Sequence, residues 1–372
     1  MSAGTIWLQV RTLLLIGVAL QAATGRAADA RGPYPVGLSS VKYVDPTRRD
    51  WNDSGPRPLA TAVWYPAPDG TPEADWTVEI FNAGHNAMGA PIAAVPAKLP
   101  LIVISHGTGG SAAGMAWLAE TLAANGYLVA AVNHHGNTGF EDSTRLEGFI
   151  VWWDRPRDMS VVIDRLLADP RFGPRIDASR IGVAGFSIGG YTALATVGAR
   201  LSESQHRAFC AANPASPLCV LPPESRSSAA DLQKLLDTNV RVKTAITHAA
   251  DPQGDPRVKA AFAIAPVLGP AMTDDSLAHI DVPVRIVVGS ADNQAVPAVN
   301  AVSIAGRIPG STLEILPGVT HYSFLPSCTE VGRNVAKLFC ADPVGVERND
   351  LHRRMAAQAV SFFDSALRVE RR

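Results

Sequence analysis

The segment RIGVAGFSIGGYTALATVGA (180–199) joins an apolar strand pattern to a helical pattern through a glycine-rich turn. The turn contains GFSIG, which places Ser187 between Gly185 and Gly189. Such a sharp strand-to-helix turn strains the backbone of the central serine, and side chains at the flanking glycines would crowd the neighbouring strand and helix. The segment therefore predicts a serine nucleophile presented at the end of a buried strand.

Further strand patterns lie on both sides of this segment. An antiparallel opening is expected at 36–44 and 59–66. Continuous apolar runs then predict buried strands at 99–107, 127–134, 180–187, 258–266, 282–290 and 311–318. Helical patterns separate most of these runs, and a last helix is expected at 348–369. The alternation predicts an α/β fold with a mostly parallel, eight-stranded sheet and helices on both faces.

Two stretches interrupt the alternation. Residues 67–97 are rich in proline, alanine and glycine, which predicts a loop. Residues 201–257 form an insert after the helix of the serine turn, with one helical patch at 229–240. An insert at the carboxyl edge of a sheet can cover a site, so one interpretation is a lid and the other is a plain surface excursion.

A serine hydroxyl becomes an effective nucleophile only when a neighbouring base takes its proton. In sheets of this kind the acid and then the histidine follow the serine, after later strands. Asp292 follows the strand expected at 282–290, and His321 follows the strand expected at 311–318. We therefore predict a triad of Ser187, His321 and Asp292, with His321 as general base and Asp292 holding its imidazole in the useful tautomer.

The negative charge on a reacting oxygen requires backbone amide donors. One is expected at Ile188, directly after the serine, and the other at Thr108, in the loop SHGTGG (105–110). His106 in that loop is expected to brace it through hydrogen bonds rather than to transfer protons. A structural role is also expected for the histidines of NHHG (133–136).

The first thirty residues have the layout of a secretory signal. Arg11 precedes the apolar run TLLLIGVALQAA (12–23), and small residues follow. The run is shorter than the ~20 residues that a spanning helix needs, so a cleavable signal peptide at 1–30 is favoured over a membrane anchor. We expect a periplasmic or secreted protein without stable membrane insertion after cleavage, in which residues 31–372 form a single domain.

Four cysteines fall in two close pairs, Cys210 with Cys219 and Cys328 with Cys340. An oxidising compartment favours disulfides, and local pairing would staple two loops, although four cysteines permit other pairings. Zinc binding is the alternative. The wide spacings and the lack of a CxxC motif argue against a metal site.

Composition and missing motifs exclude several functional classes. The net charge is −1 and 47% of the residues are hydrophobic, with no basic stripe that would indicate nucleic acid or a membrane surface. The sequence has no H-E-x-x-H motif, no Walker lysine motif and no G-x-G-x-x-G fingerprint that opens the sheet. No cofactor is therefore expected.

Several motifs together, among them LIVISHGTGG, IGVAGFSIGGYTALA, DVPVRIVVGSADNQAVP and PGVTHYSFL, carry a resemblance to a known family. The chain resembles the predicted dienelactone hydrolase-like group of bacterial α/β-hydrolases, which is similar to platelet-activating-factor acetylhydrolases. The resemblance runs from about Pro35 to the last helix and implies the same triad and the same oxyanion donors. Two positions depart from the pattern: Ser187 stands where true dienelactone hydrolases use cysteine, and Phe186 stands where many relatives have histidine.

These observations predict a hydrolase that cleaves a small-molecule or polymeric carboxylic ester through an acyl-enzyme. Hydrolysis of amides or peptides by the same triad is the first alternative. The second is a non-catalytic binding protein on a hydrolase fold, because a fold alone does not establish activity.

Overall fold

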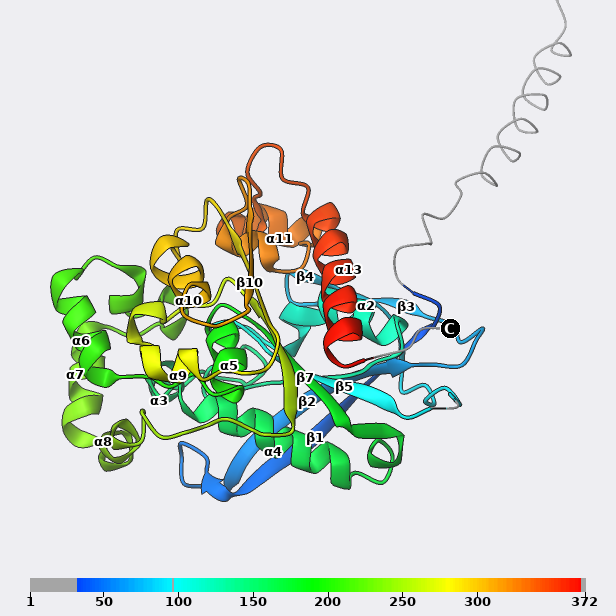
Figure 1. Ribbon diagram of the computed structural model, residues 1–372, viewed down its shortest axis with the longest axis horizontal. Coiled ribbons are helices and arrows are strands. Elements are labelled where there is room, and N and C mark those ends of the chain that lie inside the picture. Colours follow the sequence, from blue (N-terminus) through cyan, green and yellow to red (C-terminus); the bar gives the residue numbers. More distant parts are fainter. Residues whose placement is uncertain (1–31, 96, 369–372) are drawn as a thin grey trace, which may run out of the picture.

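The structure, a computed structural model, describes residues 32–95 and 97–368 and is built around one extended sheet (Figure 1). The predicted signal peptide at 1–30 lies outside the described residues. The strands are β1 (Val36–Arg49), β2 (Pro56–Pro66), β3 (Ala74–Val78), β4 (Phe81–Met88), β5 (Leu99–Ser105), β6 (Leu128–Val132), β7 (Ile176–Phe186), β8 (Val258–Ile264), β9 (Val284–Gly289) and β10 (Thr312–Leu316). Their order across the sheet is β10-β9-β8-β7-β5-β6-β2-β1-β4-β3.

The central and carboxyl-terminal strands form the parallel part of the sheet. Strands β5 to β10 run parallel to one another, whereas β2 is antiparallel to both β6 and β1. Every residue of β5 and β6 is buried, as expected for strands covered on both faces. The predicted α/β class is confirmed.

The sheet has ten strands, so the prediction of eight was wrong. The two additional strands, β3 and β4, lie in the 67–97 segment that was expected to be a loop. They form an antiparallel hairpin, and β4 pairs with β1 over only two residue pairs. Most of their side chains are exposed or half-buried, so the hairpin lacks the continuous apolar run that identified the other strands.

Helices cover both faces of the sheet. Helices α2 and α13 pack together on one face, and α4 and α5 pack together on the other (Figure 1). The helices are α2 (Ala116–Ala124), α3 (Leu146–Ile150), α4 (Asp154–Ala168), α5 (Ile188–Thr196), α6 (Glu203–Ala212), α7 (Ala229–Thr238), α8 (Val240–Thr247), α9 (Asp274–Ala278), α10 (Ser303–Ala305), α11 (Glu330–Val335), α12 (Lys337–Cys340) and α13 (Arg348–Ala366).

The 201–257 insert contains three helices, α6, α7 and α8, rather than the one helical patch expected. They lie together on the side of the molecule away from α13 (Figure 1). Neither α6 nor α7 has a fully buried side chain, in contrast to the helices that cover the sheet. The insert is therefore attached to the body without forming a packed core of its own.

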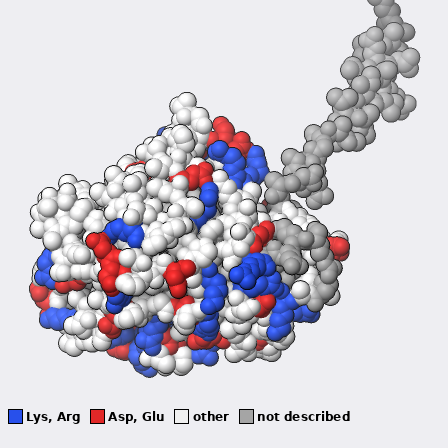
Figure 2. Space-filling view, viewed as in Figure 1, with Lys and Arg blue, Asp and Glu red and all other residues white. Residues whose placement is uncertain are grey.

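Each predicted cysteine pair forms a disulfide. Cys210 is bonded to Cys219 within the insert, and Cys328 is bonded to Cys340 around α11 and α12. The described residues contain no group of three or more histidine, cysteine or acidic side chains placed to hold a metal ion. The helices within the described ranges are also too short or too polar to cross a bilayer. Charges of both signs are interspersed over the face shown in Figure 2.

Helix α13 carries a buried histidine whose protonation state is linked to folding. His352 donates from Nε2 to the carbonyl of Ser323 (2.9 Å) and stacks on Trp117 with ring centroids 4.4 Å apart. Burial lowers the pKa of His352 to about 3. The unfolded chain, with an ordinary histidine pKa, therefore binds a proton that the folded protein excludes, and folding loses stability as the pH falls below about 6.5.

We expect a His352→Gln variant, which keeps an amide donor for Ser323, to depend less on pH. Between pH 7 and pH 5 the wild-type protein should lose about 2 kcal/mol more unfolding free energy than the variant, because only the wild type takes up this proton on unfolding. Urea unfolding at the two pH values measures the difference. Equal losses in both proteins would contradict the linkage.

Candidate active site

The serine turn adopts the strained geometry expected from its sequence. Ser187 has φ 58° and ψ −120°, between the end of β7 and the start of α5. Its amide donates to the carbonyl of Ile264 (2.9 Å), and its carbonyl accepts from the amide of Gly190 (2.8 Å). These bonds hold a backbone conformation that a side chain normally avoids.

The two glycines beside Ser187 allow close backbone contact. A Cβ atom on Gly185 would lie 2.0 Å from the carbonyl oxygen of Gly189, and one on Gly189 would lie 2.0 Å from the carbonyl oxygen of Ser105. Helix α5 can therefore start directly against the carboxyl end of β5 only if both positions lack a side chain.

The structure brings the three predicted triad residues together. Ser187 Oγ lies 3.0 Å from Nε2 of His321, and Nδ1 of His321 lies 2.7 Å from Oδ2 of Asp292. The three residues follow β7, β10 and β9, whose carboxyl ends meet at one edge of the sheet. They are between 4% and 7% exposed, so little bulk water competes for these hydrogen bonds.

The carboxylate of Asp292 is fixed by its own loop. Its Oδ1 accepts from the amides of Gln294 (2.9 Å) and Ala295 (2.7 Å), which leaves Oδ2 for His321. A carboxylate acceptor at Nδ1 keeps the proton on that nitrogen, so Nε2 is free to accept from Ser187. The ring of Phe186 packs on the imidazole with centroids 4.7 Å apart. This geometry can remove a proton from the serine hydroxyl.

The two expected oxyanion donors, Thr108 and Ile188, both line the cavity in front of Ser187. Within the described ranges, neither backbone amide donates a hydrogen bond to another protein group. The structure thus places both residues at the cavity, and their role as oxyanion donors stays a prediction.

Two other histidines near Ser187, His106 and His134, are held by structural contacts. His106 donates from Nδ1 to the carbonyl of Gly107 (2.7 Å), and His134 lies between Ser105 and Asp158. Burial lowers the pKa of His134 to about 3 and that of His106 well below its usual value, so both stay neutral. Their bracing contacts were expected, whereas the participation of Asp158, in RPRD (155–158), was not.

A cavity of about 1060 Å³ opens onto Ser187 and His321. The insert forms much of one wall, including Leu232 and Leu236 one helical turn apart on α7. The apolar lining also includes Phe149, Trp152, Leu218, Leu221, Ile246 and Leu268. The spacing of Leu232, Leu235 and Leu236 gives α7 an apolar face, but a local pattern does not show which part of the fold that face contacts, so the sequence could not place these side chains in the cavity wall.

The same cavity carries acidic and aromatic polar groups. Its acidic lining residues are Glu79, Glu141, Asp142, Glu203 and Glu224. Burial and the nearby carboxylates of Glu224 and Asp292 raise the pKa of Tyr322 to about 12, so its hydroxyl stays protonated. The cavity therefore combines a large apolar surface with several hydrogen-bonding groups.

Comparison with known proteins places this architecture among hydrolases. The sequence profile described as serine aminopeptidase, S33, matches residues 97–325. A solved ferulic acid esterase from Streptomyces cinnamoneus superposes with a TM-score of 0.62 over 94% of each chain, at 23% identity. At that identity the similarity shows the fold.

Two cutinases of Thermobifida alba, est1 and est2, are each 34% identical to this chain over 91 residues. The matched segment covers 24% of this chain and 27% of either cutinase. The similarity to these enzymes is thus confined to about a quarter of their length.

The close contact at Gly189 provides a test of the serine turn. We expect Gly189→Ala to lower the free energy of unfolding by about 3 kcal/mol, because the new methyl group meets a backbone carbonyl that cannot rotate away. Gly306→Ala is the matched control, since its nearest neighbour, the carbonyl of Val302, would be 3.5 Å away. Urea unfolding of both variants measures the contrast, and equal stability would show that α5 does not need this glycine.

Proposed function

The chain belongs to the serine aminopeptidase S33 family of α/β-hydrolases, and from this premise we propose that it hydrolyses carboxylic esters with Ser187 as the nucleophile. The observation that carries the proposal is the hydrogen-bonded series Ser187–His321–Asp292, of which Ser187 and His321 line a mostly apolar cavity. The partial similarity to two cutinases agrees with ester substrates.

In the proposed reaction, His321 Nε2 takes the proton of Ser187 as its oxygen attacks the ester carbonyl. The amides of Thr108 and Ile188 stabilise the negative oxygen of the tetrahedral intermediate. His321 then protonates the leaving alcohol, and an acyl-enzyme remains. A water molecule, activated by the same imidazole, releases the acid, while Asp292 stabilises the charged imidazole in each half-reaction.

The wall of the cavity suggests which part of the substrate the insert contacts. Leu232 and Leu236 lie on the side of α7 that lines the cavity, but no side chain of α7 is fully buried. An apolar acyl or aryl group in the cavity would complete the burial of this face. We infer that the insert acts as a lid over the apolar part of the ester, and that the two disulfides suit an exported enzyme.

Hydrolysis of an amide by the same residues is the second candidate. The description of the family names an aminopeptidase, and the acidic residues of the cavity would attract a free amino terminus. Rates on an ester and an amide with the same acyl group distinguish the two functions. A faster amide reaction would replace the ester proposal.

We expect Ser187→Ala to reduce the turnover of p-nitrophenyl butyrate by a factor on the order of 10⁵, because no other hydroxyl among the described residues is hydrogen-bonded to His321. A fluorophosphonate probe should label the wild-type protein and not the variant. Full activity in the variant would disprove the assignment of Ser187. A wild-type protein that neither reacts with the probe nor cleaves any ester would indicate a binding protein.

The lid proposal predicts a change in acyl-chain preference. Leu236→Trp should shift the preferred p-nitrophenyl ester to a shorter chain, because the larger side chain occupies part of the cavity. Lys234→Trp, on the exposed side of α7, is the control and should keep the wild-type preference. An unchanged preference in Leu236→Trp would show that the acyl chain does not reach the insert.

A further inference from the structure

We propose that His106 is a positioning residue whose imidazole aims the amide of Thr108 at the reacting oxygen, and that a buried clamp holds this arrangement. The clamp consists of Arg155 and Asp158 on α4 and the segment NHHGN (133–137) after β6. The proposal rests on the proposed function, since it assigns these residues to the oxyanion site of that reaction.

The direction of the Thr108 amide is set by the carbonyl of the preceding residue. Gly107 and Thr108 share one peptide unit, and no peptide bond among the described residues is cis. In a planar trans unit the N–H points away from the C=O. The Gly107 carbonyl accepts from Nδ1 of His106 (2.7 Å) and from the amide of Gly110 (3.2 Å). These two hydrogen bonds fix the direction of the Gly107 carbonyl oxygen. The N–H of Thr108 in the same peptide unit therefore points in the direction opposite to that oxygen.

The imidazole of His106 is itself locked in the tautomer that this role requires. Its Nε2 accepts from the backbone amide of His134 (3.2 Å), so the proton must be on Nδ1. Burial lowers the pKa of His106 well below its usual value, with the charge of Arg155 adding to the effect. The lowered pKa favours the neutral ring, which has one donor and one acceptor.

Arg155 fixes the main chain on the other side of this ring. Its Nη1 donates to the carbonyl of His106 (2.7 Å) while the side chain is only 2% exposed. Its Nε and Nη2 have no hydrogen-bond partner within the described residues. A buried guanidinium that leaves donors unpaired is costly to folding, so a positional role accounts for it better than a gain in stability.

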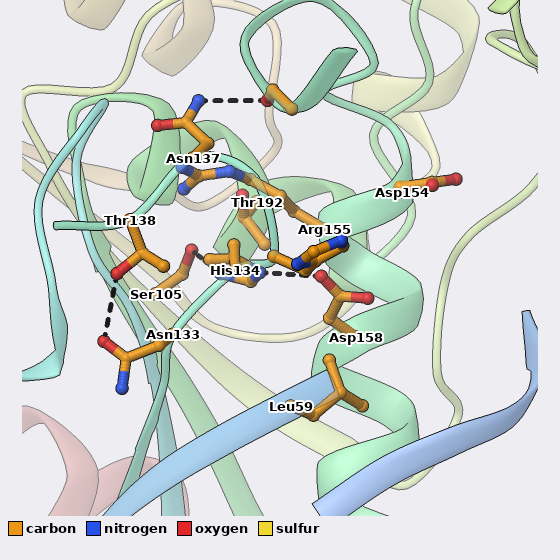
Figure 3. Close-up of polar contacts among 12 residues, drawn as sticks. Leu59, Ser105, Asn133, His134, Asn137, Thr138, Asp154, Arg155, Asp158 and Thr192 are labelled. Carbon is orange, nitrogen blue, oxygen red and sulfur yellow. Dashed lines mark hydrogen bonds and ion pairs between the residues drawn. The ribbon is translucent and has the colours of Figure 1, made fainter. Parts of the chain in front are cut away.

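A second series of contacts secures the start of the loop (Figure 3). His134 bridges Asp158 Oδ2 (2.9 Å) and Ser105 Oγ (2.8 Å). Arg57 donates to both oxygens of Asp158. The order of Ser105, His134 and Asp158 repeats that of a catalytic triad. Ser105 and Asp158 are fully buried, however, so no substrate reaches them and their role is to hold the last residue of β5.

The segment NHHGN secures the rest of the loop through its two asparagines. Asn137 Oδ1 accepts from the amide of Gly109 (2.5 Å), and Asn133 Oδ1 accepts from the amide of Ala112 (2.9 Å). The residues on both sides of Thr108 are thus fixed by buried side chains. Such preorganised donors need no rearrangement when charge develops on the substrate.

A matched pair of substitutions separates an effect on the orientation of the Thr108 amide from an effect on the stability of the fold. In His106→Asn, the side-chain amide nitrogen can take the position of Nδ1 and still donate to the carbonyl of Gly107. In His106→Gln, the longer side chain reaches the position of Nε2, where its oxygen can accept from the amide of His134 but no group donates to Gly107. Each variant loses one hydrogen bond. We expect His106→Asn to keep at least a tenth of the wild-type kcat, and His106→Gln to lose about 100-fold with little change in KM.

The affinity for a trifluoromethyl ketone, which forms a charged tetrahedral adduct with the serine, should fall in proportion to kcat in the glutamine variant. The amide signal of Thr108 in ¹⁵N-labelled protein without ligand should match the wild type in His106→Asn and shift in His106→Gln. Equal losses of kcat in the two variants, or a loss confined to KM, would overturn the proposal. If the wild type cleaves no ester, the proposed function is wrong. The Thr108 amide signals of the two variants still test whether His106 orients that amide.

If neither histidine variant folds, Arg155→Lys provides the same test, because lysine keeps a nitrogen donor without the fixed guanidinium geometry. We expect kcat and the affinity for the ketone to fall together at constant KM. Tyr43→Phe is the control, since it removes a hydrogen bond to Asp169 that has no contact with the loop. An Arg155→Lys enzyme with the kinetics of the control would overturn the role of Arg155.

Discussion

The backbone contact between the first turn of α5 and the last residue of β5 governs the arrangement of the site. With no Cβ at Gly189, the helix that starts at Ile188 lies directly against Ser105, and the loop that follows Ser105 runs beside Ser187. Thr108 and Ile188, which come from different elements, can then line one cavity. A wider separation of helix and strand would move Thr108, the second donor of the proposed oxyanion site, away from Ser187.

The protein maintains several costly features around this contact. Ser187 keeps a positive φ, a conformation that costs roughly 1–3 kcal/mol. Behind the loop, Asp158 and the guanidinium of Arg57 are buried together, with His134 kept neutral beside them. Such buried charges are tolerated when each is hydrogen-bonded, and they yield rigidity more readily than net stability. The large apolar core on both faces of the sheet offsets these costs.

The sequence was most informative where local rules are strict. The serine turn has few alternatives to GFSIG, and the buried parallel strands have continuous apolar runs, so the α/β class and the positions of Ser187, Asp292 and His321 in the fold could be predicted. The hairpin of β3 and β4 could not, because its half-exposed strands carry neither alternation nor an apolar run. Pairing with the edge of β1 decides its structure, and such pairing is not visible in a local pattern.

Two groups of residues around the site also could not be predicted from local sequence patterns. The buried partners of the loop at 105–110 come from three separate segments, so only the folded chain brings them together. The cavity wall likewise depends on where the insert settles. In both cases the contacts join residues that lie far apart in the sequence, so no local pattern predicts them. The triad could be predicted because the order of its residues along the chain follows the order of the strands that precede them.

Each of the two disulfides lies at the wall of the cavity or next to it. Cys219 itself lines the cavity, and Phe339, next to Cys340, lines it near Tyr322. Neither bridge contacts the hydrogen bonds among the serine, the histidine and the aspartate. Each bridge therefore fixes part of the cavity wall rather than the hydrogen-bonded series Ser187–His321–Asp292, so its reduction would loosen the wall and leave those hydrogen bonds with the same partners.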